Sequence, residues 1–455
     1  MIKGLFADGI FRRILKNFSW LLIGQIFVAI ANFGYLSLTA HRLGLQLFGL
    51  FILARAFIEI LIGVTTFQSW QAFIKYGAVY LKEKNRHALQ HLIKVTTLLD
   101  ILGSFGGFLI AVCLAPIIGP LVNWDAATIR EVQCCSVLML FTLGSTPMGL
   151  LRLFDRFNWL ALQQTIPSFT RLAGTIIALS LDAPFWSYLF IWVFAEAMNG
   201  VSLLFLGWRE VRRQGLLEGM NWSCPNLFKV DRTLLKFCLV SNLNSSLPLV
   251  MTVSPLIIGI FANPVAVGLY RAGYELATPL REVALLFTHS VYPELAHLSS
   301  RDRWRKFSRI ILKFTFILKG FGLFLFLLGF WFGKDLLYYA MGEDFIPAYA
   351  TLMVMVTAGI FNMGNCLLEP ALFAMGLPQI SLRVNSIAIL GIYLPFLVVL
   401  TIQFGAIGAA IATFISFFSS FTLNTIFTWK EIRLKIKLQK LRRSQRQDRE
   451  LSEVR

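Results

Sequence analysis

The sequence predicts an all-α integral membrane protein with about twelve transmembrane helices and no large soluble domain. Of its 455 residues, 57% are hydrophobic and 15% are charged, whereas soluble domains are about 45–50% apolar and about 25% charged. A membrane-spanning helix needs about 20 apolar residues, so roughly twelve spans use about 240 positions and leave short loops. This composition excludes a soluble multi-domain enzyme. It also excludes intrinsic disorder, which requires low hydrophobicity and high charge.

Twelve apolar runs, separated by charges and turn residues, define the expected spans. Ahead of the first run, apolar residues recur at helical spacing among basic ones, which predicts an interfacial amphipathic helix over residues 1–17. The twelve spans are expected at 18–40, 47–67, 92–115, 132–151, 160–181, 185–207, 237–262, 265–296, 310–332, 346–370, 383–403 and 405–429.

Lysine and arginine are distributed unequally between the two sides of these spans. With the N-terminus in the cytoplasm, 33 of the 42 Lys and Arg residues fall in cytoplasmic segments and three on the other side, namely Arg42, Arg130 and Lys334. Cytoplasmic loops of membrane proteins carry such an excess, so both termini are expected in the cytoplasm. The net charge of +18 therefore indicates topology and anionic membrane lipids as partners, and no nucleic acid.

The two halves of the chain repeat weakly at an offset of 219 residues. Phe48–Phe51 (FGLF) matches Val267–Tyr270 (VGLY), and the same offset carries the first six spans onto the last six. Because six is even, the halves share one orientation and are related by a pseudo-two-fold axis along the membrane normal, an arrangement typical of transporters. The expected domains are an N-terminal six-helix lobe over 18–229 with its connecting loop and a C-terminal six-helix lobe over 230–429.

Residues 430–455 form a basic cytoplasmic tail. Its first part, Lys430–Leu438, alternates polar and apolar residues with period two, which does not build one apolar face of a helix. We expect a solvated tail near an anionic membrane surface. The alternative is a strand that binds a partner.

Four segments resemble elements of one known family in their order and spacing. They read RLGLQLFGLF at 42–51, ANPVAVGLY at 262–270, YPEL at 292–295 and FGAIGAAIAT at 404–413. They are similar to elements of polysaccharide flippases, a family of the multidrug/oligosaccharidyl-lipid/polysaccharide exporter superfamily. In that family the first element opens the second span, the second opens the eighth span, the third closes the eighth span and the fourth opens the twelfth span. The resemblance runs from about residue 17 to 429. One departure is Ser254-Pro255, where members often carry an Asp-Arg pair.

The resemblance implies a protein that flips a polyprenyl-pyrophosphate-linked oligosaccharide across a bacterial inner membrane by alternating access. It implies a role in cell-surface polysaccharide biosynthesis (O-antigen, capsule or exopolysaccharide), and polysaccharide polymerase machinery as a partner. It also implies two six-helix lobes around a central cavity.

Cations deep in the spans are the candidate cargo contacts, because a pyrophosphate head needs a polar and preferably cationic path. A charge at the bilayer centre costs roughly 2.5–3.5 kcal/mol and seldom persists without a role or a partner. Arg171, in the fifth span, has no acid within one turn, and Arg281 lies near the middle of the eighth. Arg55 and Arg271 lie in the second and eighth spans. For all four the alternative is a structural pair with an acid, on the same helix or another.

Intramembrane acids are the candidates for H+ or Na+ coupling, since a coupled transporter needs a carboxylate in its path. Asp100 and Glu196 lack a cation one turn away, whereas Glu59 and Glu275 lie four residues after Arg55 and Arg271, close enough to neutralise them. Structural pairing is the alternative for each acid. No cofactor, catalytic site or metal site is expected, and the six cysteines show no metal-binding spacing.

Prolines within the spans are the candidate hinges. Pro248 and Pro255 interrupt the seventh span and Pro167 the fifth, and proline kinks a helix by freeing a backbone carbonyl. We expect the seventh span to bend during alternating access.

Two other functions compete with flipping. A cation-coupled multidrug exporter of the same superfamily would favour an acidic cavity, whereas several deep arginines here favour an anionic cargo. A polytopic glycosyltransferase or polymer ligase needs an outer loop with catalytic groups, and the acids of the 333–345 loop offer only a short one.

Overall fold

In the computed structural model, every regular element of the described chain is a helix. The structure describes the backbone of residues 9–67, 69–220 and 247–453, and the side chains of these ranges except at 9–26, 247–248, 282–294, 440 and 442–453. The chain divides into two compact units, Met1–Leu256 and Ile257–Arg455. The expected boundary at 229/230 and the first half of the expected interfacial helix lie outside the described residues.

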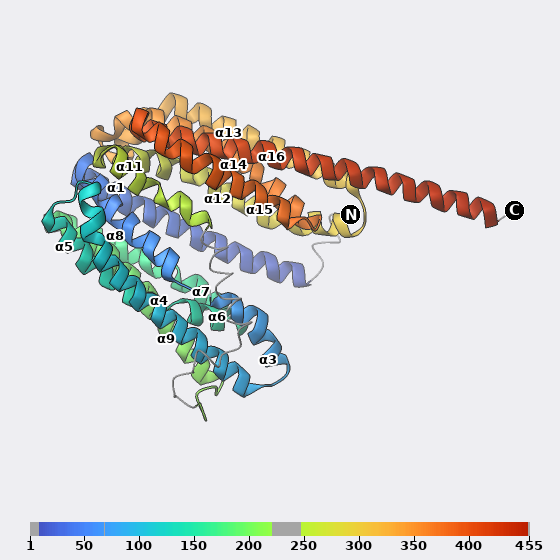
Figure 1. The fold of residues 1–455 in the computed structure, drawn as a ribbon, viewed down its shortest axis with the longest axis horizontal. Coiled ribbons are helices and arrows are strands. Elements are labelled where there is room, and N and C mark those ends of the chain that lie inside the picture. The colour runs from blue at the N-terminus through green and yellow to red at the C-terminus, as the bar shows by residue number, and fades with distance from the viewer. Residues whose placement is uncertain (1–8, 68, 221–246, 454–455) are drawn as a thin grey trace. The chain divides into compact units, whose positions relative to one another are not determined.

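Unit 1 is a bundle of long helices joined by short connections (Figure 1). Its helices are α1 (Gly9–Thr65), α2 (Trp70–Ala72), η1 (Phe73–Gly77), α3 (Ala78–Lys82), α4 (Arg86–Leu121), α5 (Ala126–Cys135), η2 (Ser136–Phe141), α6 (Ser145–Leu153), α7 (Phe157–Gln163), α8 (Thr165–Ser180), α9 (Phe185–Arg213) and η4 (Leu247–Val253).

Unit 2 is built in the same way from fewer and longer helices. The boundary between the units falls within α11 (Ser254–Phe261). The remaining helices are α12 (Pro264–Ser300), α13 (Trp304–Met341), η5 (Glu343–Ala348), α14 (Tyr349–Ala374), α15 (Pro378–Ser386), η6 (Ile387–Tyr393) and α16 (Leu394–Glu453).

Each of the twelve expected spans falls largely on helix where the structure describes it, which confirms the predicted fold class. Within the part of the chain that the structure describes, seven helical stretches are long and apolar enough to cross a membrane. Two of these stretches, which include α1 and α16, each contain two expected spans joined at a kink. The kinks fall at Gly44 (φ 67°) and Gly405 (φ 58°). Positive φ is strained for a residue with a Cβ atom, so glycine allows the chain to reverse direction there within a few residues.

Two spans of unit 1 are broken within their length. The fourth is interrupted between η2 and α6 at residues 142–144, and the fifth between α7 and α8 at Gln164. Non-helical backbone at membrane depth is tolerated only where protein or water satisfies it. The break before α6 is satisfied in part by Asp100, as described below.

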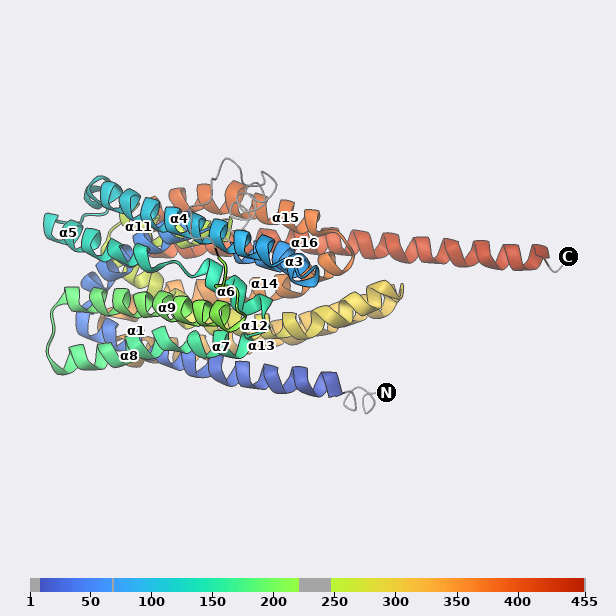
Figure 2. The ribbon, with the colours of Figure 1, turned by 90° about the horizontal axis from the view of Figure 1, so that it is seen from below.

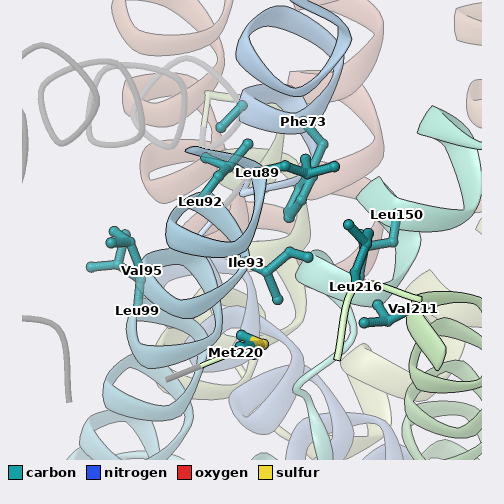
Figure 3. Packing of buried hydrophobic residues seen from close by; sticks show 11 residues of the cluster. Phe73, Leu89, Leu92, Ile93, Val95, Leu99, Leu150, Val211, Leu216 and Met220 are labelled. Atoms are coloured by element: carbon teal, nitrogen blue, oxygen red, sulfur yellow. The ribbon is translucent and has the colours of Figure 1, made fainter. Parts of the chain in front are cut away.

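A hydrophobic cluster closes the end of unit 1 that topology assigns to the cytoplasm (Figure 3). Phe73, Leu92 and Leu150, from η1, α4 and α6, are at most 1% exposed. The cluster extends to Leu216 in the turn after α9. Gln90 secures this turn by donating a hydrogen bond to the Leu216 carbonyl at 2.7 Å. The cluster therefore packs four separate segments together.

The basic tail is helical, so the partner-binding strand is wrong. Helix α16 continues without a second kink from Gly405 to Glu453. Ile432 is 1% exposed and Gln439 donates a hydrogen bond to the Asp302 carbonyl at 2.6 Å. The segment extends a helix that is already hydrogen-bonded, and Ile432 packs against neighbouring residues. These two effects outweigh the preference for a strand that the period-two pattern suggests, because such a pattern is a weak local signal.

Candidate functional site

Two predicted cargo arginines of unit 1 lie next to one buried tyrosine. Tyr35, on α1, is 1% exposed. Arg55, which follows the kink of α1, donates a hydrogen bond to the Tyr35 hydroxyl at 3.4 Å. The guanidinium of Arg171, on α8, lies 5.8 Å from the centre of its ring. We call Tyr35, Arg55, Glu59, Arg171 and Glu196 the Tyr35 cluster.

Arg171 is paired with an acid on another helix, which is the structural alternative raised by the sequence. Its guanidinium donates a hydrogen bond to the Glu196 carboxylate on α9 and a longer one, 3.4 Å, to Asn32 on α1. Arg171 is 8% exposed. Its Nε lies buried with no hydrogen-bond partner among the described residues.

Arg55 is held by a local ion pair, as its spacing from Glu59 predicts. The Nε atom of Arg55 lies 2.6 Å from the Glu59 carboxylate. Its guanidinium also lies 5.7 Å from the ring centre of Trp192, an α9 residue that is 1% exposed. An aromatic face attracts a cation, so Trp192 on α9 also holds this arginine.

The Tyr35 cluster is electrically neutral, with two arginines matched by two carboxylates. In each pair the side chain of the acid is the more exposed one. The exposed fraction of the side chain is 32% for Glu59 against 14% for Arg55, and 26% for Glu196 against 10% for Arg171. An anionic ligand must therefore displace or neutralise a carboxylate to reach a guanidinium.

Uncharged amides extend the cluster along α9 and α7. Asn199 donates a hydrogen bond to Glu196 at 3.4 Å. Gln163, which is 2% exposed, donates to both the side chain and the backbone carbonyl of Asn199 and to Ser202. Such amides can hydrogen-bond sugar hydroxyls, and they also hold α7 and α9 together.

Small residues bring α8 and α9 close enough for the Arg171–Glu196 pair. A Cβ atom at Gly174 would lie 2.7 Å from the Cγ2 of Ile191 on α9, so no larger residue fits without movement. Small residues at membrane helix crossings allow backbones to approach closely. The pair spans 25 positions in sequence, which is why spacing on one helix did not reveal it.

Unit 2 has a comparable arrangement around Tyr274 on α12. Arg271 forms an ion pair with Glu275, and its guanidinium lies 5.3 Å from the Tyr274 ring centre. Arg281, which is exposed, donates a hydrogen bond to the Tyr274 hydroxyl at 3.4 Å. The remaining two predicted cargo arginines therefore also meet at one tyrosine.

Asp100 belongs to a different set of contacts. One of its carboxylate oxygens accepts a hydrogen bond from Ser69 at 3.0 Å and the other from the Thr146 backbone N–H at 2.8 Å. Asp100 is 4% exposed. The second bond satisfies the first turn of α6, where helical N–H groups have no partner within the helix. These contacts favour a structural role for Asp100 over ion coupling.

The predicted hinge prolines lie at helix starts. Pro167 is in the first turn of α8, directly after the break at Gln164, and Pro255 is in the first turn of α11, where η4 ends. Proline is tolerated in a first turn because its missing N–H would have no partner there. The side chain of Pro248, in η4, lies outside the described residues. Bending at these breaks stays a prediction.

Sequence reasoning missed two groupings in unit 2. Glu369 on α14 accepts a hydrogen bond from Asn385 at 2.9 Å. Lys319 on α13 lies 4.2 Å from the ring centre of Phe421 on α16. Glu369 and Lys319 were recognisable as charges within spans, but nothing in the sequence points to partners on other helices.

The fold is similar to those of two solved transport proteins. An inward-facing multidrug resistance MATE family transporter of the MOP superfamily matches with a TM-score of 0.71 and 12% identity, over 90% of this chain and 95% of that chain. The lipid II flippase MurJ, in an inward closed conformation, matches with a TM-score of 0.65 and 13% identity, over 91% and 90%. At these identities the similarity establishes the fold.

Sequence comparison gives the family. The inner membrane protein YghQ of Escherichia coli (strain K12) is 26% identical over 353 residues, which cover 76% of this chain and 98% of that protein. A sequence model described as polysaccharide biosynthesis protein matches residues 14–299, more than half of the chain and all of the Tyr35 cluster. The chain therefore belongs to the polysaccharide biosynthesis protein family.

Proposed function

We propose that this protein is a multi-pass inner-membrane transporter that flips a polyprenyl-pyrophosphate-linked oligosaccharide for cell-surface polysaccharide biosynthesis. The observation that carries the proposal is the Tyr35 cluster, in which a buried arginine, Arg171, and a partly buried one, Arg55, lie within the spans. Family membership and the MurJ-like fold support transport of a lipid-linked sugar. The relative's description as an inner membrane protein supports the location.

The pyrophosphate is the part of the cargo that arginine is suited to bind. A guanidinium offers a planar fork of donors that matches two phosphate oxygens. In the proposed step, phosphate replaces Glu196 as the acceptor for Arg171, while Asn32 and Tyr35 keep the guanidinium in place. Asn199 and Gln163 can then donate to the sugar, and the polyprenyl chain stays in lipid.

The neutrality of the cluster supports proton coupling as a second part of this proposal. A proton on Glu196 or Glu59 releases an arginine from its ion pair, so the cluster gains a positive charge when anionic cargo arrives. Loss of that proton restores the ion pair and expels the cargo. Glu275 in unit 2 is paired in the same way with Arg271 and could act alike, whereas both oxygens of Asp100 are already engaged.

The test uses the producing bacterium with the gene removed. Polyprenyl-pyrophosphate-linked oligosaccharide in the inner membrane is quantified after wild-type, Arg171→Ala or Arg130→Ala copies are restored. Complete repeat units should accumulate on the cytoplasmic side, and wild type and the Arg130 control, an exposed arginine, should clear them. The Arg171→Ala protein should insert into the membrane but should not clear the accumulated lipid-linked oligosaccharide. An unchanged lipid-linked pool in the deletion strain would contradict flipping.

One observation favours the multidrug exporter as a second candidate. Glu59 and Glu196 are more exposed than the arginines they pair with, and partly exposed carboxylates suit a cationic drug. Raised sensitivity of the deletion strain to cationic drugs, together with an unchanged lipid-linked pool, would support export. The solved proteins of similar fold are described as transporters or a flippase, which favours transport over a glycosyltransferase or polymer ligase.

A further inference from the structure

We propose that the cytoplasmic end of α16 is a docking helix for an acidic, amphipathic helix of a cytoplasmic protein. Residues 430–453 continue α16 beyond Trp429 without a kink, a length of about 36 Å at about 1.5 Å per residue. In Figures 1 and 2 this end projects as one straight helix beyond α14 and α15. The proposal is independent of the cargo.

One face of this helix packs against the start of α13 and the turn before it. Ile432 is buried, the ammonium of Lys435 lies 5.6 Å from the ring centre of Trp304, and Gln439 is hydrogen-bonded to the Asp302 carbonyl. These contacts with the turn between α12 and α13 fix the rotation of the helix. The opposite face therefore points outward in a defined way.

That outward face carries three exposed leucines. Leu434, Leu438 and Leu441 are 49%, 44% and 52% exposed. Their spacing of four and three residues places them on one stripe of a helix. It is the spacing with which a helix packs against a second helix.

The charge around the stripe selects the occupant. Residues 433–446 contain seven Lys or Arg and no Asp or Glu, and Arg433 and Lys437 are exposed next to the leucines. A second copy of this helix would bring like charges together, which is unfavourable at such a seam. A helix bound to lipid head groups lies in the membrane plane, whereas this one continues the axis of a span. An acidic, amphipathic partner helix would cover the leucines with its apolar face and pair its carboxylates with the basic residues.

The test measures peptide binding to the full-length protein in nanodiscs of zwitterionic lipid. The probe is a fluorescent helical peptide with leucine at heptad positions a and d and glutamate elsewhere, and fluorescence anisotropy reports its binding. We expect saturable binding that is weakened by salt. Leu434→Ser/Leu438→Ser/Leu441→Ser should weaken it about tenfold or more, since a few buried side chains dominate such interfaces.

Two further variants make the result specific. Val79→Ser/Leu81→Ser alters exposed apolar residues of another basic cytoplasmic segment and should bind the probe like wild type. Arg433→Glu/Lys437→Glu should lose affinity for the acidic peptide and gain affinity for its lysine counterpart.

Three outcomes would overturn the proposal. They are absence of probe binding to the wild type, equal binding to the triple serine variant, and loss of binding when the nanodisc contains phosphatidylglycerol. The last would assign the leucine stripe to the anionic membrane surface instead.

Discussion

Arg171 on α8 and Glu196 on α9 form an ion pair across two helices at membrane depth. Breaking a fully buried pair costs roughly 3–5 kcal/mol because it strands one charge, whereas neutralising both partners together is often tolerated. This difference separates a residue needed for folding from a residue needed for cargo.

We therefore expect Arg171→Gln and Glu196→Gln singly to lower the free energy of unfolding by about 1–3 kcal/mol, less than for a fully buried pair because Glu196 is partly exposed. The double variant should regain most of this loss. Its clearance of lipid-linked oligosaccharide should still fall about 10- to 100-fold, the value of one hydrogen bond to a charged group. Unfolding in detergent and the lipid-linked pool are the two measurements. Normal clearance by the stable double variant would assign the pair to folding alone.

Asp100 should behave as a helix cap. Asp100→Asn keeps an oxygen that can accept the Thr146 N–H, so we expect nearly normal folding and clearance. Asp100→Ala loses that acceptor and should cost about 0.5–2 kcal/mol of stability, as for other N-cap losses. Thermal unfolding and the lipid-linked pool report both effects. A normally folded Asp100→Asn protein without transport would instead support the coupling role.

Gly405 should not tolerate a side chain. Its φ of 58° and ψ of −127° lie in a region that is essentially restricted to glycine, so Gly405→Ala should cost about 1–3 kcal/mol. Gly320→Ala is the matched control, because a Cβ atom there meets nothing within 4 Å. Thermal unfolding of both variants in detergent gives the comparison, and equal melting temperatures would show that the kink can relax.

Pro255 should affect transport more than insertion. It lies at the junction between η4 and α11. Alanine would allow a more regular and stiffer helix across that junction. Pro255→Ala should therefore slow clearance while leaving the amount of inserted protein unchanged. Pro184→Ala, at the N-cap of α9, serves as the control. Wild-type clearance by Pro255→Ala would remove this position from the hinge.

Most of the fold was predictable because hydropathy and charge act locally. A span must be apolar over its whole length whatever it packs against, so the predicted runs fall largely on helices where the structure describes them. The exception at the C-terminus has a local cause as well. Residues 430–438 alternate with period two, yet the helix before them is already formed and adding residues to it is easy.

The candidate site was predictable only in part. The i,i+4 pairs Arg55–Glu59 and Arg271–Glu275 could be inferred because helix geometry places such residues together. The pairing of Arg171 with Glu196 could not be inferred in this way, because it depends on the packing of α8 against α9. The same holds for Tyr35, which tertiary structure brings next to Arg171 of α8. Tyr274 differs, because Arg271 and Arg281 lie on the same helix, α12.

By itself, the sequence determined the membrane environment, the spans and the charges placed within them, since these depend on residue type and spacing along one helix. Only the tertiary structure decided that Arg171 is neutralised by Glu196, that Asp100 caps α6, and that the leucines after Trp429 are left uncovered. The physical reason is that the cost of a charge in a membrane is set by residue type, whereas its partner is set by whichever helix packs beside it.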